Sequence, residues 1–83
     1  MSYTLSRIWE ILVSGSDSVD EELDVQTGLM SLPIEQRVFI VMLANGHTSA
    51  QAMSRAGVRR GRSPAQGTQM KRDVLEKIAR RIN

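Results

Sequence analysis

The chain has 83 residues, of which 41% are apolar and 24% charged, and it contains no cysteine. This length suits one small domain, residues 1–83, and excludes a large enzyme, while the balance of apolar and charged residues excludes wholesale disorder. The longest uninterrupted apolar stretch, residues 38–44, is far shorter than the roughly twenty residues of a membrane-spanning helix, so we expect no membrane partner. Without cysteine or a secretory signal, a cytoplasmic protein is the default expectation.

Charge is distributed unevenly along the chain. Residues 1–54 carry two basic and seven acidic side chains, a net charge of −5, whereas residues 55–83 carry nine basic and two acidic ones, a net charge of +7. Such a basic segment indicates an anionic partner, and nucleic acid is the leading candidate. The alternative is an ordinary solvated surface.

Two helices are predicted in the acidic part of the chain. Ser18 and Glu21 have the spacing of a capping box, and the acidic residues that follow Ser18 suit the positive end of a helix dipole, so a helix is predicted over residues 19–31. Before it lies an accessory segment, residues 4–16, in which Thr4 can cap the start of a helix and Gly15 can end it. Its predicted helix, residues 4–14, has apolar residues at helical spacing: Leu5, Ile8, Trp9 and Leu12.

A third helix is predicted between Pro33, which suits a first helical position, and the stop signal Asn45-Gly46. The apolar run 38–43 inside it is also compatible with a buried strand, because short apolar runs are ambiguous. A lone strand would have no obvious partner in this sequence. We therefore expect a central helix that is apolar around most of its circumference.

Two further helices are predicted in the last third of the chain. A capping box that begins at Thr48 predicts a short helix over residues 49–56, and a serine followed by a proline predicts a last helix over residues 64–82. Gly67 lowers the helix propensity there by about 1 kcal/mol, which makes Thr68 an alternative start. The predicted fold is an all-α bundle of four to five helices.

The last two predicted helices are separated by a turn of the kind found in a helix-turn-helix. Gly57 between them can take the left-handed turn conformation, and Val58 can drop into the core behind it. One face of the last helix is predicted to pack inward and comprises Met70, Val74, Leu75, Ile78 and Ile82. On the solvent side, two ion pairs at i,i+4 are expected to neutralise one another's charge: Asp73 with Lys77 and Glu76 with Arg80.

The cations without a close sequence partner cluster around the start of the last helix and comprise Arg55, Arg59, Arg60, Arg62, Lys71 and Arg72. Free backbone amides and the positive end of the helix dipole at that place also attract phosphate. Arginine and glutamine suit two-pronged contacts with guanine and adenine edges. We predict base or groove-edge contacts for Gln66, Thr68, Gln69 and Arg72, and phosphate contacts for the other cations of the cluster.

A series of short motifs recurs in the same order in a known protein family. The series is Leu32-Pro33, Gln36-Arg37, an apolar helix, Gly46, and a short helix that ends Ala56-Gly57-Val58. On these motifs, residues 17–82, about four fifths of the chain, resemble region four of bacterial sigma factors. The resemblance implies that segment 17–83 binds double-stranded DNA with its last helix and also contacts RNA polymerase.

Three departures from the family pattern change what the resemblance implies. The family has a small alanine four residues before the turn glycine, where this chain has Met53, with Ala52 one residue earlier. The turn is lengthened by Arg59-Arg60-Gly61-Arg62, and 83 residues leave no space for the sigma region that melts promoter DNA. We therefore expect a small phage or mobile-element transcription regulator rather than a complete sigma factor.

Signals of catalysis or ligand binding are weak. His47 stands alone, and neither a phosphate-binding loop nor a nucleophile elbow is present, so we expect no enzyme, metal or cofactor. Trp9 and Phe39 are expected to pack in the core.

Two other functions stay open. One is a factor that binds RNA polymerase or a sigma factor through the acidic N-terminal part without reading DNA, and the other is the DNA-recognition module of a phage packaging small subunit. A homodimer also stays open, because helix 4–14 can pack on its own chain or on a second copy.

Overall fold

The structure, a computed structural model, describes residues 3–57 and 64–83, with the backbone alone at residues 64–66. The described residues form helices joined by turns, without a β-strand, which confirms the predicted all-α class. The helices are α1 (Leu5–Ser14), α2 (Val19–Met30), α3 (Ile34–Ala44), α4 (Ser49–Arg55) and α5 (Pro64–Ile82).

Side-chain caps fix the starts of three helices. The hydroxyls of Thr4 and Ser18 accept hydrogen bonds from the backbone amide three residues later, at 3.1 Å and 3.4 Å, and begin α1 and α2. Before α4, Thr48 and Gln51 form both bonds of the predicted capping box, each at 3.1 Å. Each cap satisfies an amide that the first helical turn leaves without a partner, so these boundaries follow from local sequence.

The capping box predicted at Ser18 is only half formed. The Glu21 carboxylate, which was expected to accept from the Ser18 amide, instead accepts from Arg7 at 2.9 Å and 3.2 Å and from the Ser16 hydroxyl at 2.9 Å. The Arg7 guanidinium holds the pKa of Glu21 below its ordinary value. This bidentate pair joins α1 to α2, a use of Glu21 that local spacing did not indicate.

Helix α3 includes the whole apolar run 38–43, so the alternative of a buried strand is wrong. Pro33 lies at the N-cap of α3 rather than at its first helical position, and the helix begins at Ile34. Phe39 and Ile40 are completely buried because α3 contacts α1, α4 and α5. A helix surrounded in this way is apolar around most of its circumference, as predicted.

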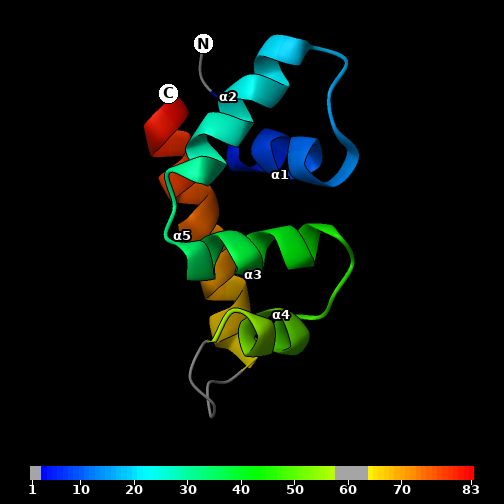
Figure 1. Cartoon of the computed structure of the whole chain (residues 1–83), viewed down its shortest axis with the longest axis vertical. Coiled ribbons are helices and arrows are strands. Elements are labelled where there is room, and N and C mark those ends of the chain that lie inside the picture. The colour runs from blue at the N-terminus through cyan, green and yellow to red at the C-terminus, as the bar shows by residue number, and fades with distance from the viewer. Residues whose placement is uncertain (1–2, 58–63) are drawn as a thin grey trace.

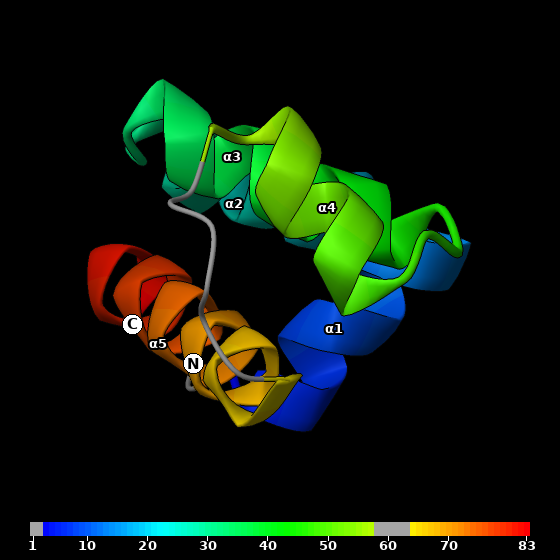
Figure 2. The same cartoon turned by 90° about the horizontal axis from the view of Figure 1, so that it is seen from below.

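Helix α5 runs along the long axis of the molecule, and the other four helices all contact it. In Figure 1, α1, α3 and α4 lie across α5 at successive levels, and α2 lies near its C-terminal end. Seen along that axis, α3 and α4 lie on one side of α5, and α1 lies beside it (Figure 2). The shared core contains side chains that are at most 2% exposed from all five helices: Ile8, Val25, Phe39, Ile40, Ala52, Val74 and Ile78.

The contact between α2 and α5 depends on Gly28. A Cβ atom at this position would lie 2.8 Å from Cγ2 of Ile78 and 3.1 Å from Cγ2 of Ile82. These distances are too short for a side chain, so glycine lets the two helices approach closely. Nothing in the sequence pattern indicated this role for Gly28.

Tyr3, two residues before α1, ties the start of α1 to the rest of the chain. The Tyr3 amide donates a hydrogen bond to Oδ1 of Asn83 at 2.6 Å, and Nδ2 of Asn83 donates to the Tyr3 carbonyl at 3.1 Å. The Tyr3 hydroxyl donates to Asp24 of α2 at 2.7 Å. Helix α1 therefore packs on its own chain, the first of the two arrangements that the sequence left open.

Candidate nucleic-acid interface

The two helices of the predicted helix-turn-helix, α4 and α5, contact each other. Gly57, two residues after the end of α4, has a φ of 78°, the left-handed conformation predicted for the turn. Ala52 and Met53 on the inner side of α4 are buried. Val58, which was expected to be buried in the core, lies outside the described residues.

Gly67 sets how closely α4 and α5 approach. A Cβ atom on Gly67 would lie 2.7 Å from Cβ and 3.0 Å from Oγ of Ser49, and 3.6 Å from the sulfur of Met53. The small residue at this crossing therefore belongs to α5, whereas the sigma-like pattern has its small alanine on the preceding helix, where this chain has Met53. From the sequence, Gly67 was interpreted only as a loss of helix propensity. The sequence did offer an indication of this role, because a glycine inside a helix often marks a place where another element packs closely against it.

Three of the exposed residues that were predicted to contact DNA form no ion pair within the described residues. Arg55 is the last residue of α4, and Thr68 and Gln69 lie in the second turn of α5. Gln69 donates a long hydrogen bond of 3.4 Å to Asp73, and the side chains of Arg55 and Thr68 form no hydrogen bond within the described residues. All three can therefore reach a ligand with little loss of existing bonds.

Lys71 has a partner that sequence spacing could not indicate. Its Nζ atom lies 3.9 Å from the centroid of the Trp9 ring, which is the geometry of a cation–π contact. Trp9 is half-buried on α1 and packs against the core, as expected, and its ring also binds this cation. Lys71 therefore joins α5 to α1 near the candidate interface.

Arg72 also has a partner, so the prediction that it lacks one close in sequence is wrong. Its Nε atom donates to Oε1 of Glu76 at 3.2 Å, one helical turn away. The Arg72 side chain is 72% exposed in this pair. An exposed ion pair contributes only about 0–1 kcal/mol, so Arg72 can exchange Glu76 for another anion at small cost.

The two ion pairs predicted along α5 are absent from the described residues, where Glu76 instead binds Arg72. Those pairs were Asp73 with Lys77 and Glu76 with Arg80. Lys77, Arg80 and Arg81 are exposed, and none of them forms an ion pair in the described part of the chain. Within the described residues, the C-terminal half of α5 therefore has more cations outside ion pairs than the sequence spacing indicated.

The structure does not place the side chains of four of the predicted contact residues. Arg59, Arg60 and Arg62 lie outside the described residues, and Gln66 lies in the first turn of α5 with only its backbone described. The structure places the others at the end of α4, Arg55, and along the second and third turns of α5, Thr68, Gln69, Lys71 and Arg72.

Among residues 3–57 and 64–83, no group of three or more His, Asp or Glu side chains is arranged to hold a metal ion. His47 is exposed in the turn between α3 and α4. Within the same ranges, none of the helices has the length and apolar character needed to cross a membrane. Comparison with protein-family models, with curated proteins and with solved structures finds no match to this chain.

Proposed function

We propose that this chain is a DNA-binding transcription regulator that binds duplex DNA through α4 and α5 and acts together with RNA polymerase. One observation carries the proposal. The close α4–α5 pair presents exposed, hydrogen-bonding side chains at Arg55, Thr68 and Gln69, and all three lie in residues 55–83, which carry a net charge of +7. The role of polymerase rests on the resemblance to sigma region four.

The proposed interface divides into side chains that bind phosphate and side chains that read bases. Lysine and arginine bound to phosphate supply affinity that is largely independent of sequence, whereas contacts with base edges supply specificity. Gln69 on the exposed side of α5 suits an adenine edge, and Arg72 suits a guanine edge. Arg55 and the arginines of residues 59–62 suit phosphate.

Selection of bound duplexes from a random pool, with RNA polymerase present and absent, tests the proposal. We expect enrichment of a defined sequence, and enrichment only in the presence of polymerase would identify a polymerase-dependent factor. Gln69→Ala should lose about 1–3 kcal/mol of binding free energy and relax selection at one base position. Gln26→Ala, an exposed glutamine on α2, is the matched control and should select the same sequence as the unaltered chain.

Absence of enrichment in both arms would contradict the proposal. Equal selectivity of the unaltered chain and Gln69→Ala would remove Gln69 from base reading while leaving the phosphate contacts to be tested separately.

A further inference from the structure

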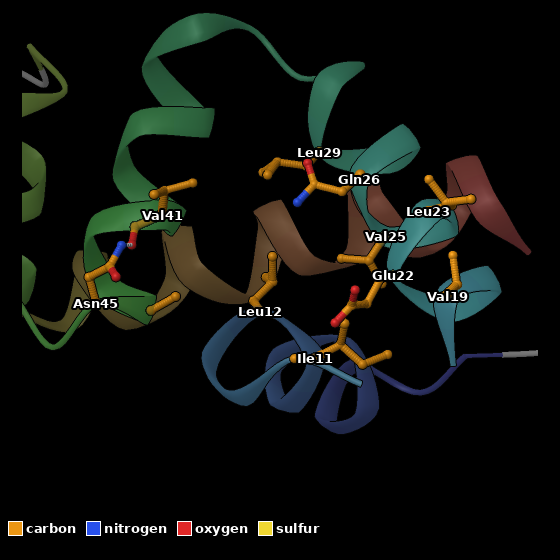
Figure 3. A pocket seen from close by; sticks show the side chains of 12 residues that line it. Ile11, Leu12, Val19, Glu22, Leu23, Val25, Gln26, Leu29, Val41 and Asn45 are labelled. Atoms are coloured by element: carbon orange, nitrogen blue, oxygen red, sulfur yellow. Dashed lines mark hydrogen bonds between the residues drawn. The ribbon is translucent and has the colours of Figure 1, made fainter. Parts of the chain in front are cut away.

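A groove of about 410 Å³ lies between α1, α2 and α3, away from the α4–α5 pair. Figure 3 shows side chains of all three helices around it, including Leu12 of α1, Leu23 of α2 and Val41 of α3. Its lining is mostly apolar, and Glu22 is its one charged residue in the described part of the chain. The walls are open to solvent, since Val19 and Leu23 are 68% and 59% exposed. A small-molecule site would enclose its ligand far more completely.

The exposed side of α2 carries the groove residues Val19, Leu23 and Gln26 and continues to Met30, which lies beyond the groove. Val19, Leu23, Gln26 and Met30 follow one another at intervals of four, three and four residues, and Met30 is 61% exposed. That spacing places the four side chains along one stripe of the helix. The other face of α2, with Val25, is already buried. A stripe of this form is the surface against which a second helix packs with anchors at i, i+3, i+4 and i+7.

The groove has two candidate occupants, a second copy of this chain and a helix of another protein, and the charge around the groove decides between them. Helix α2 contains four acidic residues and no basic one: Asp20, Glu21, Glu22 and Asp24. Of these, Glu21 is paired with Arg7, whereas the other three form no ion pair within the described residues. Arg37, whose Nη1 atom donates to the Met30 sulfur at 3.8 Å, is a cation at one end of the stripe. A second copy of the chain on the same surface would therefore bring together two helices with four acids each and only one such arginine from each copy. A helix with lysine or arginine beside its apolar stripe matches both the shape and the charge.

We propose that the groove between α1, α2 and α3 binds an amphipathic helix of another protein, with apolar anchors on the Val19–Leu23–Met30 stripe and basic residues facing the acids of α2. This site does not depend on DNA binding, because none of its lining residues belongs to α4 or α5. Helix α1, which lies outside the sigma-like segment, forms one wall.

Calorimetric titration of the full chain with a synthetic helical peptide tests the proposal. The peptide has leucines at i, i+3, i+4 and i+7 flanked by lysines, and a matched peptide has glutamates in place of the lysines. We expect the lysine peptide to bind about tenfold or more tightly than the glutamate peptide. Leu23→Lys should weaken the lysine peptide by about tenfold or more, because it removes an anchor and adds a like charge.

Val13→Lys is the control, since Val13 is an exposed apolar residue of α1 outside the groove. It should bind the lysine peptide as the unaltered chain does, and both variants should keep the thermal unfolding midpoint because both side chains are exposed. Equal binding of the two peptides, or unchanged binding by Leu23→Lys, would overturn the proposal. A dimer in sedimentation that Leu23→Lys dissociates would overturn it in favour of a second copy. Leu23→Lys should leave DNA binding unchanged, so a failure of either proposed site is separable from the other.

Discussion

Tyr3 is the only tyrosine of the chain, and its ionisation reports directly on the contact between the segment before α1 and helix α2. The hydrogen bond from its hydroxyl to Asp24, together with burial, raises the pKa of Tyr3 from 10.0 to about 12. Because the folded pKa is above the unfolded one, the neutral phenol contributes stability that is fully present below pH 10. That contribution is lost as the pH rises from 10 towards 12.

An absorbance titration of the phenol checks this assignment. We expect the midpoint of the folded chain to lie well above that of the denatured chain, and Asp24→Ala should move it down towards the denatured value. A folded midpoint that coincides with the denatured one would show that the Tyr3–Asp24 hydrogen bond is not formed in solution.

At the scale of the helices, the close α4–α5 contact can be tested at Gly67. Helix propensity alone predicts that Gly67→Ala stabilises the chain by about 1 kcal/mol. The added Cβ would instead lie 2.7 Å from Cβ of Ser49, and overpacking of this kind destabilises by typically about 1–3 kcal/mol. We therefore expect a net decrease in the free energy of unfolding, measured by urea denaturation.

A second substitution separates the clash from other effects of the alanine. Ser49→Gly removes the atoms that the new Cβ would meet, so Gly67→Ala combined with Ser49→Gly should be more stable than the sum of the two single changes predicts. If Gly67→Ala alone is more stable than the unaltered chain, the helices do not approach as closely as described here.

The boundaries of the helices could be predicted because their causes are local. Thr4, Ser18 and Thr48 cap amides only three residues away, and Gly57 takes the turn conformation that its missing side chain permits. The apolar stripe of α5 also packs inward as its spacing predicts.

The contacts between helices could not be predicted, because they join residues that are far apart in the chain. The close approaches at Gly28 and Gly67 and the Lys71–Trp9 contact depend on how the helices pack. The ion pairs along α5 failed as predictions for a different reason, which is local. Spacing at i,i+4 offers Glu76 two partners, Arg72 and Arg80, and the helix uses the first.

Across the whole molecule, the two proposed surfaces lie on different sets of helices. The groove is lined by α1, α2 and α3, and the proposed DNA-binding surface belongs to α4 and α5, with α2 and α4 towards opposite ends of the long axis (Figure 1). The charge of the chain is divided in the same sense, −5 in residues 1–54 and +7 in residues 55–83. Such a division suits a small protein that holds an acidic and a basic partner at once.

The salt dependence of duplex DNA binding tests the central proposal most directly. Five phosphate contacts, from Arg55, Arg59, Arg60, Arg62 and Lys71, predict a slope of about −4 to −5 for the logarithm of the association constant against the logarithm of salt concentration. Arg60→Ala and Arg62→Ala should each flatten that slope by about one, while Arg81→Ala at the other end of α5 should leave it unchanged. Absence of salt-sensitive binding at low ionic strength would contradict the account, and an unchanged slope in Arg60→Ala and Arg62→Ala would remove those arginines from the interface.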